Sequence, residues 1–169
     1  MRLTPIALSI GIAVATMASA GHGQWPDDQI DARSMALLQR GQALIAAGKF
    51  AEATDTLESA LAVDPRNRGA YVGLARSAQG QKLPGKAIKM YFQALKLEPN
   101  DVGALAGQGE ALVQRGAVER AKRNLERIKT ICKEPCPQAT TLAAVIAKGP
   151  PPEALAAQVR ETVPPAAKN

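Results

Sequence analysis

Small and large apolar residues recur along this chain in the same order, at a spacing of 34 residues. Small residues occupy two sets of equivalent positions: Gly41, Ala75 and Gly109, and Ala53, Ala87 and Ala121. Large apolar residues occupy two others: Leu37, Tyr71 and Leu105, and Leu57, Tyr91 and Leu125. The recurrence predicts three copies of one structural unit.

Each unit is predicted to hold two helices, because small residues let paired helices approach while large residues fill the space beside the crossing. Pro65 and Pro99 end the second helix of the first two units, since proline cannot continue a helix. The predicted units are residues 34–67, 68–101 and 102–135, followed by a capping helix at 137–148, in a domain of residues 31–148. One such hairpin cannot bury its own apolar face, so neighbouring units must stack.

The pattern resembles the tetratricopeptide repeat, over roughly residues 34–133. The first unit carries nearly every signature position: Gly41, Gly48, Phe50, Ala53, Leu57, Ala60 and Pro65. The second unit departs at Lys82 and Pro84, and it has Ala75 in place of glycine. The third has Ile128 and Lys133 where alanine and proline are expected. The resemblance implies an all-α, right-handed superhelical stack of about three helix-turn-helix units with a C-terminal capping helix.

The resemblance also implies a concave groove, lined by the first helix of each unit, that binds a peptide or helix of a protein partner. Its positions in this chain are Met35, Leu38, Gln42, Ile45, Gly69, Val72, Gly73, Arg76, Gln79, Gly103, Ala106, Gly107, Glu110 and Val113. Some relatives clamp a terminal carboxylate with lysine, arginine and asparagine side chains. The corresponding positions here are Leu38, Gln42, Gly73, Gly103 and Gly107. A clamp of that kind is therefore disfavoured.

Two pairs of glycines stand four residues apart on one helix face, and each glycine costs up to about 1 kcal/mol of helix stability relative to alanine. The pairs are Gly69 with Gly73 and Gly103 with Gly107. One hypothesis is that these strips admit a closely packed partner segment, oriented by the charges of Arg76 and Glu110. Tight packing between neighbouring units explains the glycines equally well.

The chain begins with the pattern of a secretory signal peptide at residues 1–20. Arg2 precedes an apolar run from Ile6 to Ala18, which is shorter than the ~20 residues of a membrane-spanning helix. We expect cleavage before Gly21, no stable membrane insertion afterwards, and a periplasmic or secreted protein. A polar arm at 21–30 and a tail rich in proline and alanine at 149–169 are expected to flank the repeats.

Cys132 and Cys136 are the only cysteines. In an oxidising compartment they are predicted to form a disulfide that fixes the capping helix, with no metal and no cofactor. The alternative is a copper-binding or thiol-redox protein, because C-x-x-x-C-P resembles the copper-binding segment of Sco-type copper chaperones and two thiolates suit Cu(I). Those proteins add a histidine ligand from a thioredoxin-like fold, whereas the one histidine here is His22.

The composition narrows the function classes. Aromatic residues make up 3% of the chain, and its formal charge of +6 is spread along it, so nucleic acid is not an expected partner. The repeat region has no histidine and no glycine-rich phosphate loop, so no enzyme is predicted. We expect a non-catalytic scaffold or assembly factor of the cell envelope that binds a protein or peptide.

Overall fold

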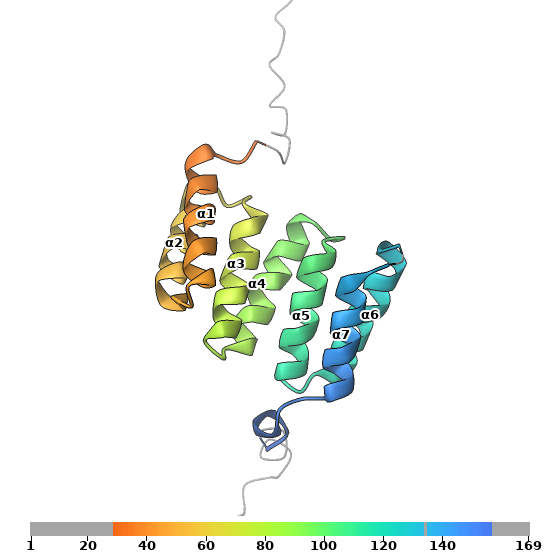
Figure 1. Ribbon diagram of the computed structural model, residues 1–169. Helices are drawn as coiled ribbons and strands as arrows, with labels where there is room; N and C mark the ends of the chain where they lie inside the picture. The colour runs from red at the N-terminus through yellow and green to blue at the C-terminus, as the bar shows by residue number, and fades with distance from the viewer. Residues whose placement is uncertain (1–28, 134, 157–169) are drawn as a thin grey trace, which may run out of the picture.

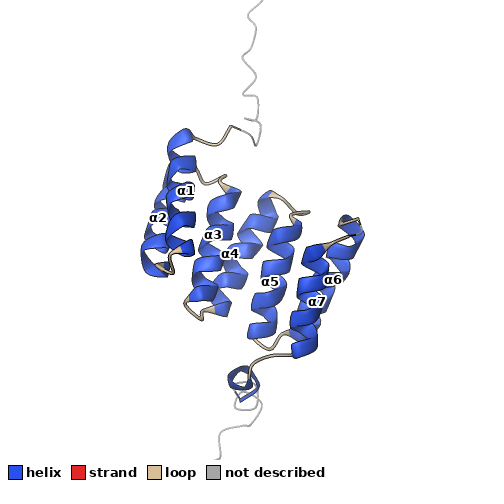
Figure 2. Cartoon of the chain, in the orientation of Figure 1, coloured by secondary structure: helices blue, strands red, loops and turns tan. Residues whose placement is uncertain are grey.

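A computed structural model describes residues 29–133 and 135–156. The predicted signal peptide, most of the predicted N-terminal arm and the end of the predicted tail lie outside these ranges. Helices and loops make up the whole described part, with no strand (Figure 2). The helices are α1 (Ala32–Ala46), α2 (Phe50–Val63), α3 (Arg68–Gly80), α4 (Pro84–Leu97), α5 (Val102–Gln114), α6 (Val118–Ile131) and α7 (Pro137–Lys148). Residues 152–156 are also helical.

Local sequence signals explain where these helices begin. The helices α1, α3 and α5 each follow a residue whose side chain accepts a hydrogen bond from a backbone N–H of the first turn: Asp31, Asn67 and Asp101. Proline occupies the start of α4 and α7, where its missing N–H costs nothing. Between the helices of a pair, Gly48 and Gly116 adopt positive φ angles of 72° and 85°.

Consecutive helices pack as three hairpins, and the hairpins stack side by side (Figure 1). The equivalent residues Ala53, Ala87 and Ala121 have no exposed surface, which lets the two helices of each pair approach closely. Each first helix also contacts the first helix of the next hairpin, and α7 packs against both α5 and α6. The predicted fold class, an all-α stack of helix pairs with a capping helix, is confirmed for the described residues.

A polar network connects the first hairpin to the second. The Asp64 carboxylate, which is 4% exposed, accepts hydrogen bonds from the Asp31 backbone N–H at 3.1 Å and from the Arg66 guanidinium at 2.9 Å. The Asn67 amide donates to the Ser34 hydroxyl at 2.8 Å, and this hydroxyl donates to a backbone carbonyl of α2. Because these groups are buried and satisfied, they fix the relative orientation of the two hairpins.

The capping helix covers the end of the stack through Leu142, which has no exposed surface. A Cβ built at Gly109 would lie 2.6 Å from the Leu142 Cδ2 atom, so glycine at this position of α5 makes room for the cap. None of the described helices has the length and apolar character needed to cross a membrane.

Candidate functional site: the first-helix face

The helices α1, α3, α5 and α7 lie side by side in one layer, in front of α2, α4 and α6 in Figure 1. We call the outer side of this layer the first-helix face. Ten of the fourteen predicted groove residues are exposed or half-exposed. They are Met35, Gln42, Ile45, Gly69, Val72, Arg76, Gln79, Gly103, Gly107 and Glu110. The other four, Leu38, Gly73, Ala106 and Val113, are buried, although Leu38 still lines a cavity together with Met35 and Gly69.

Three of the four strip glycines pack against side chains of neighbouring helices. A Cβ at Gly69 would lie 2.7 Å from Leu38 Cδ2, and one at Gly73 would lie 2.9 Å from Leu57 Cδ1. A Cβ at Gly107 would overlap the Tyr91 ring, with Cε1 at 2.8 Å. Gly103 is the exception, because a Cβ there would meet only the Oδ1 atom of the N-cap residue Asp101, at 3.2 Å. At three positions the structure therefore supports packing within the stack, the alternative to a strip that admits a partner.

A cluster of polar side chains lies where α3 meets α5 on this face. Tyr91 reaches it from α4, and its hydroxyl donates a hydrogen bond to the Gln79 side chain at 2.8 Å. Burial raises the pKa of Tyr91 to about 12, with a further contribution from the Glu110 charge that the Arg76 charge opposes. The charges of Arg76 on α3 and Glu110 on α5 therefore both act on this hydroxyl. We call these four residues the polar cluster.

Glu110 is the acidic member of the polar cluster, and its carboxylate has no partner among the described residues. Its side chain is half-buried, and it makes neither a hydrogen bond nor an ion pair with any residue that the structure describes. Burial raises the pKa of this carboxyl above its usual range. Arg76 is exposed and equally unpaired among the described residues. A partly dehydrated carboxylate in this situation gains from a cationic or N–H donor supplied by another molecule.

The sequence missed the contribution of Tyr91 to this face. Its place in the repeat predicted a large group filling the space between helices, and the ring does so, being 3% exposed. The hydroxyl adds a hydrogen bond at the surface that an apolar residue could not make. The signal was available, because Tyr91 stands where the other two units have leucine.

Cys132 and Cys136 lie at the junction of α6 and α7, with their Cα atoms 5.9 Å apart and their sulfur atoms in contact. That Cα separation is typical of disulfides. Cys136 is 4% exposed and packs in an apolar cluster with Leu125, Ile128 and Leu142. No group of three or more histidine, cysteine, aspartate or glutamate side chains within residues 29–133 and 135–156 is arranged to hold a metal. The placement gives Cys136 a role in packing.

Comparisons with known proteins agree with this architecture. Two family models, both described as tetratricopeptide repeat, match residues 34–77 and 72–122. No curated protein sequence matches the chain.

Several solved structures are similar to it. The second TPR domain of human RPAP3, in complex with an HSP70 peptide, has a TM-score of 0.63 and 23% identity, covering 68% of this chain and 95% of that one. The first TPR of Spaghetti (RPAP3), bound to an HSP90 peptide, has a TM-score of 0.64 and 22% identity, covering 69% and 91%. The Yersinia enterocolitica type III secretion chaperone SycD, in complex with a peptide of YopD, has a TM-score of 0.59 and 16% identity, covering 75% and 93%. At these identities the likeness concerns the fold.

Proposed function

Because this is a protein built of tetratricopeptide repeats over residues 34–122, we propose that it is a non-catalytic scaffold that binds a peptide or helix of another protein across the first-helix face. The observation that carries the proposal is that the half-buried carboxylate of Glu110 and the exposed guanidinium of Arg76, on neighbouring first helices, are both unpaired among the described residues. Similar solved structures, of RPAP3 and SycD, hold peptides, which supports the same class of function here.

The chemistry of the face indicates what this peptide must carry. A basic side chain opposite Glu110 would pair with its carboxylate, and an acidic one opposite Arg76 would pair with its guanidinium. The five positions at which some relatives clamp a terminal carboxylate hold leucine, glutamine and three glycines. The partner is therefore a segment with charges of both signs, and its terminal carboxylate is not bound by a cationic clamp.

We further propose that the protein is exported and acts as an assembly factor of the cell envelope. The pattern of residues 1–20 supports export. In the same setting Cys132 and Cys136 form a disulfide, which joins the end of α6 to the start of α7. Closing so short a loop lowers the entropy of the unfolded chain and thereby stabilises the fold by about 2 kcal/mol. The copper or thiol-redox alternative gains no support from the burial of Cys136 among apolar side chains.

Site-specific photo-crosslinking in cells that make the protein tests the binding face. A photoreactive amino acid at Gln42 or Val72 reports on the first-helix face, and one at Lys96 or Glu126 reports on the second helices. We expect one protein to be captured from the first two positions only. Capture of the same protein with equal yield from both pairs of positions would contradict the proposal.

The captured protein is then purified and titrated against charge-reversed variants. Glu110→Lys is expected to weaken its binding at least about tenfold, because it places a cation opposite the partner's cation. Asp55→Lys makes the same charge change on the exposed side of α2 and is the matched control. If both variants bind the partner with the affinity of the wild type, the charge of Glu110 does not contribute to binding.

Mass spectrometry of the protein isolated from its native envelope tests the export proposal. We expect an amino terminus at Gly21 and a mass lower by two hydrogen atoms than that of the reduced chain. A full-length chain with two free thiols would contradict both parts.

A further inference from the structure

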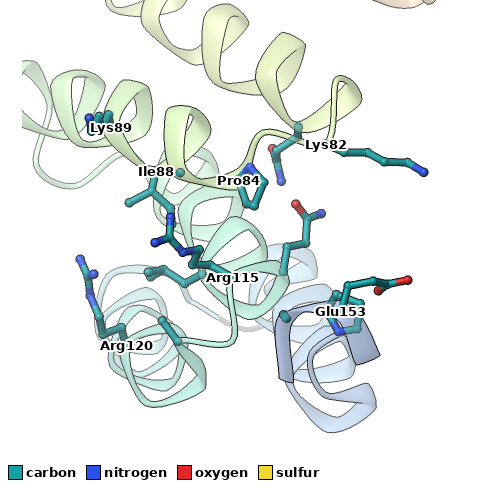
Figure 3. A pocket seen from close by; sticks show the side chains of 14 residues that line it. Lys82, Pro84, Ile88, Lys89, Arg115, Arg120 and Glu153 are labelled. Atoms are coloured by element: carbon teal, nitrogen blue, oxygen red, sulfur yellow. The ribbon is translucent and has the colours of Figure 1, made fainter. Parts of the chain in front are cut away.

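A cavity of about 1010 Å³ opens at one end of the stack. Four segments surround it: the α3–α4 turn, the first turns of α4, the α5–α6 turn and residues 151–154 (Figure 3). It borders the polar cluster at Gln79, which belongs to both, but its cationic side chains come from the turns and the second helices rather than from the first-helix face. We call it the turn-end pocket.

Four cationic side chains line the turn-end pocket: Lys82, Lys89, Arg115 and Arg120. Figure 3 shows Lys89 and Arg120 on one side, Lys82 on the other, and Arg115 between them. None of the four makes a hydrogen bond or ion pair with a residue that the structure describes. Glu153 is the acidic side chain in the lining. Six ion pairs form elsewhere in the described chain, whereas the four cations gathered here have no acidic partner among the described residues.

Lys82 occupies its place in the pocket at a conformational cost. It has a positive φ of 57°, and it stands where the other two units have Gly48 and Gly116. A side chain with a Cβ is strained in this left-handed region, and glycine is not. Strained backbone of this kind concentrates at functional sites. A lysine at this position of the α3–α4 turn, which borders the pocket, indicates that its charge is useful there.

The floor of the turn-end pocket is apolar. Ile88, Leu112 and Ala117 contribute to it, and the Arg115 guanidinium lies beside Ile88 (Figure 3). Pro84 and Gly85 bring the start of α4 to the same cavity, and the first turn of α4 contains no acidic residue. The positive end of the helix dipole therefore adds to the four cations. The lining suits a ligand that combines negative charge with an apolar group.

We propose that the turn-end pocket is a second binding site, which takes a short acidic segment of another protein. Carboxylates of this segment pair with the cations at the rim, and an apolar side chain covers the floor formed by Ile88 and Leu112. A free phosphate group would neutralise the cations but leave this floor uncovered. The site adds to the first-helix face and does not depend on it.

Fluorescence anisotropy with the full chain tests the proposal. The probe is a labelled peptide in which glutamates flank a central leucine and phenylalanine. One comparison peptide replaces the glutamates by glutamines, and another replaces the two apolar residues by alanines. We expect the glutamine peptide to bind at least about tenfold more weakly and the alanine peptide about fivefold more weakly. Added salt should weaken the binding of the probe.

The double variant Arg115→Gln/Arg120→Gln is expected to weaken probe binding roughly tenfold, because each exposed charge pair contributes up to about fivefold. The control Arg33→Gln/Arg40→Gln removes the same charge from exposed positions of α1 and should stay within about twofold of the wild type. If the first double variant fails to fold, Lys89→Gln with Lys96→Gln as its control, both on α4, replaces it.

Lys82→Gly separates binding from structure. We expect it to lower probe affinity about threefold while raising the Tm, since glycine removes both the charge and the backbone strain. A purely structural role for Lys82 predicts a change in Tm without a change in affinity.

Three results would overturn the proposal. The first is equal probe affinity in the Arg115→Gln/Arg120→Gln variant and its α1 control. The second is equal binding of the glutamate and glutamine peptides. The third is binding of inorganic pyrophosphate or phosphatidylglycerol vesicles that needs the same cations while the alanine peptide binds as well as the probe, because that is a site for simple anions. None of these results bears on the first-helix face, which is tested with other residues.

Discussion

Replacing Gly107 by alanine tests whether this glycine serves packing within the stack. In an exposed helix the change would stabilise α5 by up to about 1 kcal/mol through helix propensity. Here the new methyl group would meet the Tyr91 hydroxyl and ring, with Cε1 at 2.8 Å, and Tyr91 is too buried to move aside freely. Overpacking of this kind costs about 1–3 kcal/mol, and loss of the Tyr91–Gln79 hydrogen bond adds about 1 kcal/mol. The expected net effect is a loss of about 1–3 kcal/mol.

Gly103→Ala is the matched control, because it is the same substitution four residues earlier on the same helix. A Cβ there meets only the Asp101 Oδ1 atom, at 3.2 Å, and otherwise open space. The free energy of unfolding should therefore be unchanged or raised, by up to about 1 kcal/mol. Urea denaturation followed by far-UV circular dichroism measures both variants, and unchanged m-values would show that only stability differs.

The two variants together decide between packing and partner binding. If Gly107→Ala is as stable as Gly103→Ala, the contact with Tyr91 does not limit this position. The glycine strip would then have to be explained by a bound partner. If Gly107→Ala alone is destabilised, the close approach of α4 to α5 that glycine permits offsets the helix stability that glycine loses relative to alanine.

Four further predictions concern stability and pH. Lys82→Gly should raise the free energy of unfolding by about 1 kcal/mol in urea denaturation, whereas Lys82→Ala, which keeps the Cβ, should not. Asp64→Ala should lower it by about 2 kcal/mol, because it leaves donors to the carboxylate without an acceptor. Hydrogen bonds from Arg66 hold the pKa of Asp64 well below its usual range, so the wild type should lose this stabilisation as pH falls below the ordinary carboxyl range, and the variant should not. Burial raises the pKa of Glu110, so its ionisation destabilises the fold as pH rises from the ordinary carboxyl pKa through the raised one. Glu110→Gln should remove that step and be more stable than the wild type at neutral pH, as thermal melts across this pH range would show. Reduction of the proposed Cys132–Cys136 disulfide should lower the free energy of unfolding by about 2 kcal/mol, and Cys132→Ser should be insensitive to the reductant.

The helix pairs could be predicted from sequence because their signals are local. The spacing of Ala53, Ala87 and Ala121 identifies where paired helices approach, and all three are fully buried. Pro65 and Pro99 follow closely after α2 and α4 end. Such signals depend on the period of one helix and on residues that stop it, and both can be read without knowing what packs nearby.

The exposed surface was harder to predict because stacking decides it. Leu38 and Val113 were expected on the groove, yet they are 7% and 2% exposed. Helical periodicity indicates which face of a helix meets its partner within the hairpin. It does not indicate how much of the next face the neighbouring hairpin covers. Gly69 illustrates this, since its close contact is with Leu38 of the preceding hairpin.

Departures from the repeat pattern gain meaning only when the structure shows where they lie. Lys82 and Pro84 break the pattern in the second unit, and in the sequence alone they are only imperfections. In the structure both residues line the turn-end pocket, and Lys82 is strained where its equivalents are glycines. A repeat has no structural reason to replace a relaxed turn residue by a strained cationic one, since glycine at this turn would be more stable. The proposed second site supplies such a reason, and on this view a break in an internal repeat indicates a site more directly than the recurring pattern does.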